Sequence, residues 1–222
     1  MKKKIFSIVA AILILTSALC ALVACGQKSD GEKTNDNISR RTDAYFAGES
    51  ETFAVSVEKG RREKTFIADG KTVDVVDFCC ITVTPLKSND YKSVSFVIKA
   101  DDKTLSGEIA TSDFGEFSTD ITLDFNPKTV TVTAGEEVCD IEMSNILEGA
   151  LSSLDAVNVA KDAFKDKIAK EHEDGKAERE IYVKLITGDR VNYYYYVSFI
   201  GDGLDYWAML IDPKTGDIIS KR

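Results

Sequence analysis

The side chains that most often carry out chemistry are few and scattered in this 222-residue sequence. Its only histidine, His172, stands between Glu171 and Glu173. A metal site there would need further nitrogen or sulfur ligands at a suitable spacing, and the sequence contains neither His-Glu-x-x-His nor Cys-x-x-Cys. A serine hydrolase would need this same histidine and a Gly-x-Ser-x-Gly turn, which is missing. We therefore expect His172 to be a solvated residue at a helix end.

Other signals for a cofactor or a metal are also missing from the sequence. The glycine-rich nucleotide motifs Gly-x-x-x-x-Gly-Lys-Ser/Thr and Gly-x-Gly-x-x-Gly do not occur. Asp101-Asp102 and Glu136-Glu137 fall in expected turns, and no Asp-x-Asp-x-Asp-Gly loop offers calcium ligands. We expect no cofactor, no metal and no catalytic residue, and hence a protein that is not an enzyme.

Three cysteines follow the first 25 residues, at positions 79, 80 and 139. Adjacent strand residues point to opposite faces, so at most one of Cys79 and Cys80 can meet Cys139 in a common core. Three interpretations stay open: all three are small buried side chains, one disulfide forms and leaves a thiol over, or the cysteines have a redox or metal-binding role. Cys80 and Cys139 are the candidate pair for such a disulfide.

The most unusual local composition is the run Tyr193-Tyr194-Tyr195-Tyr196, followed by Tyr206-Trp207. In a strand, half of the run would pack beneath a helix and the other half would form an aromatic surface. Tyrosine and tryptophan are enriched at protein interfaces because they combine a large rigid area with a polar group. Cross-strand aromatic pairing explains the same pattern without a partner. The candidate interface residues are Tyr194, Tyr196, Tyr206 and Trp207.

The charge of the chain is unevenly distributed. The formal net charge is -9, from 28 basic and 37 acidic residues, and three of the basic ones, Lys2, Lys3 and Lys4, open the chain. Without them the rest carries -12, a balance that repels phosphate backbones, so we expect no nucleic-acid partner. The uncharged, mostly apolar run 5–24 then has the features of a secretory signal. A plain membrane-spanning anchor is the alternative.

The end of the apolar run favours lipidation. Leu22-Val23-Ala24-Cys25 resembles a bacterial lipobox, in which the cysteine is acylated and becomes the mature N-terminus. The resemblance implies a lipoprotein signal peptide over 1–24 and a lipid on Cys25, whose acyl chains would hold the protein on a membrane surface. Residues 25–44 begin with a polar stretch that predicts a flexible tether. We expect the remaining chain to be extracytoplasmic and anchored to the cell membrane.

The hydrophobic pattern divides the folded part into two regions. Period-two patterns separated by turn residues predict an antiparallel, immunoglobulin-like β-sandwich over 45–148, with strands that include 117–125. Helical spacing begins near Ser152 or Ser153 and ends at 171–175, before four more strand patterns. The fold class expected is mainly β plus α+β, with a second domain over 151–222 in which one helix packs on an antiparallel sheet.

The C-terminal region also resembles a known module. The helix pattern over 153–160 and the closing hairpin Met209-Leu210-Ile211-Asp212-Pro213-Lys214-Thr215-Gly216-Asp217-Ile218-Ile219 are similar to a PepSY domain, found in exported bacterial proteins and in some peptidase propeptides. The resemblance covers roughly 151–222 and supplies no catalytic residues. It implies binding of protein or peptide at the cell envelope, with regulation or inhibition of a secreted peptidase in trans.

These expectations combine into one leading function and one alternative. The leading function is a membrane-anchored, non-enzymatic protein-binding or peptide-binding lipoprotein. Its expected partner is an extracellular peptidase or another envelope protein. The alternative is a structural or ligand-binding envelope lipoprotein that makes its contacts through the β-sandwich.

Overall fold

The structure is a computed structural model that describes residues 37–87, 90–111 and 117–222. The predicted signal peptide, the lipidation at Cys25 and the first part of the tether lie outside these residues. Residues Asn37–Arg222 form one compact unit. Within the described ranges, no helix is both long and apolar enough to cross a membrane.

The described chain is mainly β with one long helix, which confirms the fold class at this level. The elements in order are β1 (Ile38–Glu49), β2 (Phe53–Glu63), β3 (Val75–Pro85), β4 (Ser93–Ala100), β5 (Lys103–Ala110), β6 (Phe117–Asp120), β7 (Thr129–Ala134), β8 (Glu137–Glu142), β9 (Ser144–Asn145), α3 (Ser153–Glu173), β10 (Glu180–Thr187), β11 (Tyr193–Ile200), the 3-10 turn η1 (Asp202–Leu204), β12 (Tyr206–Ile211) and β13 (Ile218–Lys221).

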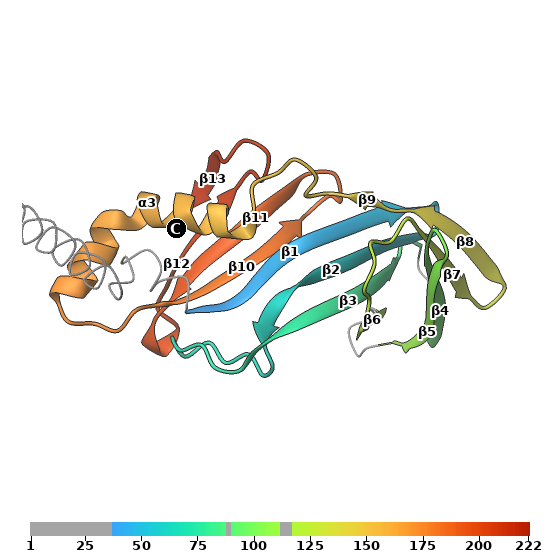
Figure 1. Cartoon of the computed structure of the whole chain (residues 1–222), viewed down its shortest axis with the longest axis horizontal. Coiled ribbons are helices and arrows are strands. Elements are labelled where there is room, and N and C mark those ends of the chain that lie inside the picture. Colours follow the sequence, from blue (N-terminus) through green and yellow to red (C-terminus); the bar gives the residue numbers. More distant parts are fainter. Residues whose placement is uncertain (1–36, 88–89, 112–116) are drawn as a thin grey trace, which may run out of the picture. The chain divides into compact units, whose positions relative to one another are not determined.

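One large sheet contains strands from both halves of the chain. Its order is β13-β12-β11-β10-β1-β2-β3-β6, and the short β9 also pairs with β1 (Figure 1). The pairing of β1 with β10 is parallel, with Ile38 opposite Ile181, whereas the other ladders of this sheet are antiparallel. Strand β1 therefore joins the two regions that the sequence pattern treats separately.

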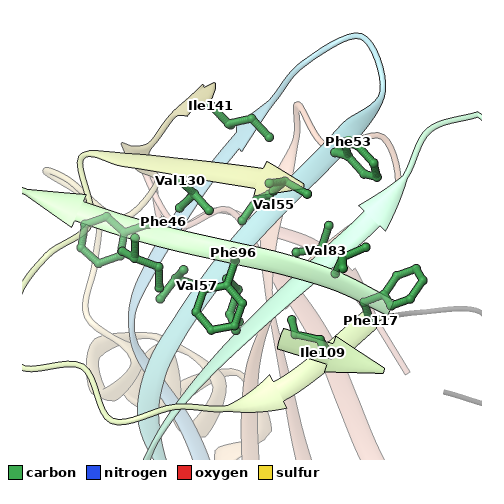
Figure 2. Close-up of a cluster of buried hydrophobic side chains, with 14 of the residues drawn as sticks. Phe46, Phe53, Val55, Val57, Val83, Phe96, Ile109, Phe117, Val130 and Ile141 are labelled. Atoms are coloured by element: carbon green, nitrogen blue, oxygen red, sulfur yellow. The ribbon is translucent and has the colours of Figure 1, made fainter. Parts of the chain in front are cut away.

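A second, four-stranded sheet of order β5-β4-β7-β8 packs against β1, β2 and β3. The predicted alternation is confirmed here, because Phe53, Val55 and Val57 of β2 are buried, as are the even-numbered residues of β4 from Val94 to Ile98. Figure 2 shows side chains from both sheets pointing into this common core. Burial of apolar area at such a core is the main term that stabilises the pairing of the two sheets.

Helix α3 lies on β10 and β11 and forms the second core (Figure 1). The predicted start is confirmed, because the hydroxyl of Ser152 accepts the N–H of Asp155 and the Asp155 carboxylate accepts the N–H of Ser152, a capping box. The predicted end is confirmed too, with Gly175 at φ +69° directly after the cap residue Asp174. Ala156, Val157, Ala160 and Phe164 form the buried side of the helix.

The structure differs from the sequence prediction at three places. Residues 38–44, predicted as tether, form the first half of β1. The expected boundary between 148 and 151 does not separate two sheets, because β1 pairs with β2 on one edge and with β10 on the other. The strand predicted over 117–125 pairs with β3 only as far as Asp120, although Ile121, Leu123 and Phe125 still pack on the core.

Candidate functional site

Neither α3 nor the small sheet covers one face of the large sheet, which we call the open face. On β10 and β11, Tyr182 and Tyr196 alternate with residues buried beneath α3. On β2 and β3, Glu58 and Cys80 alternate with residues buried beneath the small sheet. Arg40 of β1 contacts both sets, with its guanidinium 5.9 Å from the Tyr182 ring centre and Nη2 2.8 Å from Glu58 Oε2. The open face thus runs continuously across β1.

Aromatic side chains enclose a hollow on this face, which we call the aromatic hollow. Its volume is ≈ 320 Å³, its walls are almost entirely apolar, and it is lined by Phe66, Ala68, Tyr182, Tyr196, Ser198, Ile200 and Tyr206. The ring centres of Phe66 and Tyr182 are 5.2 Å apart, and those of Tyr182 and Tyr196 are 6.5 Å apart at an edge-on angle of 69°. These are ordinary separations for interacting aromatic rings. The rings therefore support one another and keep the hollow open.

The β2–β3 loop, residues 64–74, supplies one wall of the hollow and is held by buried polar groups. Glu180 Oε2 accepts the N–H of Gly70 at 3.2 Å, and Glu63 Oε1 accepts the N–H of Val73 at 2.6 Å. Asn37 Oδ1 accepts the N–H of Thr72 at 3.1 Å. Each of these side-chain oxygens accepts a hydrogen bond from a backbone N–H of the loop that has no partner in a β-ladder. The loop, with Phe66 on it, is thereby fixed against the sheet.

Glu180 is an unusual group in this arrangement, because its side chain is 0% exposed and its second oxygen, Oε1, has no hydrogen-bond partner among the described residues. Burial raises the pKa of Glu180, and the hydrogen bond from the Gly70 N–H offsets part of this rise. The ionised form of Glu180 therefore lowers the stability of the folded state.

A second hollow of ≈ 570 Å³ lies further along the open face, where β1 and β10 separate. We call it the polar hollow, because hydroxyl and charged groups share its walls with apolar ones. Its lining residues on this face include Ser56, Glu58, Cys80, Thr82, Thr84 and Lys184. Lys184 pairs across the strands with Tyr196, so its side chain stands between the two hollows.

The structure brings only some of the predicted interface residues together. Tyr196 and Tyr206 line the aromatic hollow. Trp207, in contrast, is 9% exposed and packs beneath α3, with its ring centre 5.5 Å from that of Phe164. Its neighbour Tyr206 faces the other side of the strand, so strand alternation separates this predicted pair. Tyr194 lines a different hollow, beside Pro213.

Phe66 and Tyr182 also line the aromatic hollow, although they are not among the interface residues predicted from the sequence. Phe66 lies in a polar loop without any periodicity, so no pattern pointed to it. Tyr182 sits in a predicted strand, two residues before Lys184 on β10 and therefore on the same face of the sheet. Alternation within that strand was therefore the signal that could have identified Tyr182.

Cys79, Cys80 and Cys139 are free thiols, so the candidate disulfide between Cys80 and Cys139 is not formed. Cys79 points into the core between the sheets, and burial raises its pKa to about 11. Cys80 points to the open face, with Sγ 3.2 Å from Ser118 Oγ. Cys139 lies on β8 of the small sheet, 3.0 Å from Thr52 Oγ1. The faces of β3 keep Cys80 away from Cys139.

His172 is exposed at the last turn of α3, where the sequence placed it. In the part of the chain that the structure describes, no group of three or more His, Cys, Asp or Glu residues is arranged to hold a metal ion. No protein-family model, curated protein or solved structure matches the chain, so the geometry of the open face carries the functional argument.

Proposed function

We propose that this protein is a lipid-anchored extracytoplasmic lipoprotein that binds a protein or peptide segment in the aromatic hollow of its open face. Export and acylation at Cys25 rest on the lipobox-like sequence. Binding rests on the hollow, which is the observation that carries the proposal. The anchor would hold the open face near other proteins of the cell envelope.

The walls of the hollow suit an apolar side chain. Phe66 and Tyr206 remain 48% and 39% exposed, although large apolar and aromatic groups gain free energy when they leave water. A partner that covers them would gain about 25 cal/mol for each Å² of apolar area removed from solvent. Tyrosines are also frequent among the residues that dominate binding energy at protein interfaces. The hollow therefore has the composition of a binding hot spot.

The size of the hollow limits what can occupy it. Pockets for small molecules have volumes of about 300–1,000 Å³, so ≈ 320 Å³ is near the lower limit. One or two side chains fit this space better than a whole cofactor. A side chain inserted from a protein surface would leave the rest of the partner to spread over the open face.

The finer fold assignments are part of the proposal. The two packed sheets around β1–β3 support an immunoglobulin-like sandwich, and α3 followed by β10–β13 supports a PepSY-like unit. If the PepSY resemblance extends to function, an exported peptidase is the partner class to test first. Regulation would then be in trans, with the peptidase presenting the inserted segment.

Photo-crosslinking in the producing cells tests this proposal. In one variant of the full chain, p-benzoylphenylalanine replaces Tyr206 at the rim of the hollow. In the control variant it replaces Val191, which is 77% exposed and lies outside the hollow. We expect a discrete crosslinked protein from position 206 and none from position 191. The crosslink should disappear when Tyr196→Ser is added. Identical products from both positions, or a product insensitive to Tyr196→Ser, would refute binding at the hollow.

The anchor is tested separately by metabolic labelling with an alkyne fatty acid. Wild-type protein should incorporate the label and sediment with membranes. Cys25→Ala should do neither. Cys20→Ala, which replaces the cysteine inside the apolar run 5–24, should behave as wild type. Labelling that survives Cys25→Ala would rule out the predicted lipidation site.

A further inference from the structure

Lys184 is a charged residue of β10 beside the aromatic hollow. It stands opposite Tyr196 in the β10–β11 ladder, and it shares a face with Tyr182, two residues earlier on β10. Directly opposed residues in such a ladder have Cβ atoms about 4.5–5.5 Å apart. The ammonium group at the end of this side chain can therefore reach the rim of the aromatic hollow. It also lines the polar hollow on the other side.

The cations near Lys184 are already paired, whereas Lys184 has no ion-pair partner among the residues that the structure describes. Arg40 pairs with Glu58 at 2.8 Å, and Arg190 pairs with Glu49 at 3.1 Å. Lys184 is only half-buried, and no carboxylate of the described residues accepts a hydrogen bond from it. A lysine without an ion-pair partner at this position offers a site for an incoming carboxylate.

Other ligand chemistries fit the aromatic hollow less well. A sugar would bury hydroxyl groups against walls with almost no polar atoms, and unpaired polar groups are costly to bury. A quaternary ammonium group would compete with cations already over the rings, because Arg40 lies over Tyr182 and Arg222 lies 5.2 Å from the Tyr206 ring centre. An uncharged apolar side chain meets neither obstacle.

We infer that the partner segment inserts an apolar side chain into the aromatic hollow and places an adjacent carboxylate on Lys184. The inference rests on the proposed function and adds the chemistry of the partner to it. The segment is a stretch of protein in which Asp or Glu neighbours Pro, Leu or an aromatic residue. The hollow supplies most of the affinity, since central aromatic contacts dominate interfaces, and Lys184 supplies selectivity for acidic segments.

Selection from a displayed library of random nine-residue peptides on the full chain tests the inference. Peptides enriched on the wild type should carry Asp or Glu within two positions of an apolar residue more often than the unselected library. On Lys184→Glu this preference should change to Lys or Arg. A matched control, Lys165→Glu, makes the same charge change on the exposed side of α3 and should leave the acidic preference intact.

Affinities of the enriched peptides give the quantitative outcome. Lys184→Glu should weaken the best acidic peptide about threefold to tenfold, which is typical of a partly exposed ion pair that is reversed. Tyr196→Ser and Tyr206→Ser should each weaken it at least about tenfold, because each removes a wall of the hollow. Circular dichroism of each variant shows whether the fold is retained. If Tyr196→Ser unfolds the protein, Tyr206→Ser alone tests the contribution of the hollow, because Tyr206 is exposed and its substitution should not disturb the core.

Failure of the inference can be distinguished from failure of the proposed function. Peptides that need Tyr206 but show no acidic preference, and bind Lys184→Glu equally, would overturn the role of Lys184 and leave binding at the hollow standing. Peptides insensitive to both tyrosine substitutions would overturn both. Binding of purified envelope polysaccharide that depends on Tyr206, without enrichment of any peptide, would overturn both in favour of a glycan ligand.

Discussion

The ring of Phe66 lies 5.2 Å from the ring of Tyr182, tilted by 55°, and this contact joins the β2–β3 loop to the open face of the sheet. Phe66 comes from the N-terminal half of the chain and Tyr182 from the C-terminal half. The aromatic hollow therefore exists only when both halves are folded onto one sheet. Its geometry depends on how firmly the loop is held.

Phe66→Ser should weaken binding more than it weakens the fold. Because Phe66 is half exposed, the substitution should cost about 0.5–1 kcal/mol of unfolding free energy, the value of one aromatic pair. The crosslink formed from position 206 should fall at least threefold, as one wall of the hollow is lost. Val191→Ser serves as the control and should alter neither measurement. Equal crosslinking by both variants would show that the loop is no part of the site.

Glu180→Gln should stabilise the protein at neutral pH. Since the folded-state pKa of Glu180 is raised above its ordinary value of 4.5, the folded protein holds this proton more tightly than the unfolded chain. Ionisation therefore removes stability as pH rises through the folded-state pKa. The amide keeps an acceptor for the Gly70 N–H and carries no charge, so we expect a gain on the order of 1 kcal/mol at pH 7.5.

The gain should be absent near pH 4, where the wild-type carboxyl is protonated in both states. Urea unfolding at pH 4, 6 and 7.5 measures the difference. Glu173→Gln, at the exposed end of α3, makes the same chemical change and should be neutral throughout. A destabilisation by Glu180→Gln that is equal at all three pH values would contradict the role assigned to the buried charge.

Arg179 holds the end of α3 against the sheet. Its Nη2 atom is 2.6 Å from Glu171 and 2.6 Å from Asp205, and its guanidinium lies 4.0 Å from the Trp207 ring centre. Because only 8% of the Arg179 side chain is exposed, Arg179→Met should cost about 2 kcal/mol. Arg179→Lys keeps the charge but not the forked geometry, and should lose an intermediate amount.

The same cluster predicts an acid dependence. Hydrogen bonds from Arg179 lower the pKa of Glu171, so its stabilisation is present above the ordinary value of 4.5 and is lost as pH falls through the folded-state pKa. As pH falls below 4.5, the difference in unfolding free energy between wild type and Arg179→Met should narrow, and it should disappear once Glu171 and Asp205 are both protonated. Curves that stay parallel until the carboxyls of both Glu171 and Asp205 are protonated would mean that Arg179 acts through packing on Trp207.

The order of thiol labelling should follow burial. Burial raises the pKa of Cys79 to about 11, so little thiolate is present at pH 8 and iodoacetamide should modify it last. Cys80 and Cys139 are only half-buried and should react first. Mass spectrometry of peptides after timed alkylation gives the order. Fast reaction at Cys79, or a protein that reacts only after reduction, would contradict the arrangement of the three cysteines.

The sequence was most informative where the deciding interactions are local. The Ser152 cap and the Gly175 ending depend on neighbours within a few residues, and the alternation of β2 and β4 depends on each strand's own pattern. The coarse class, mainly β with one helix, follows from such signals.

Non-local pairing could not be predicted in this way. Residues 38–44 contain three charged side chains, Arg40, Arg41 and Asp43, and Ile38 is their one large apolar residue. They nevertheless pair with strands on both edges. Nothing local specifies that β10, far along the chain, lies parallel to β1. For the same reason the contact of Phe66 with Tyr182, and hence the hollow, is visible only in three dimensions.

Gly48 of β1 lies directly against the end of β8. A Cβ atom on Gly48 would lie 2.1 Å from the backbone oxygen of Glu142 and 2.8 Å from Ile141 Cγ2. Backbone at that distance cannot move aside without separating the strands, so Gly48→Ala should cost about 1–3 kcal/mol. Gly188→Ala, with nothing within 4 Å, should change stability by less than about 0.5 kcal/mol. Urea unfolding compares the two variants, and equal midpoints would show that β1 does not approach β8 this closely.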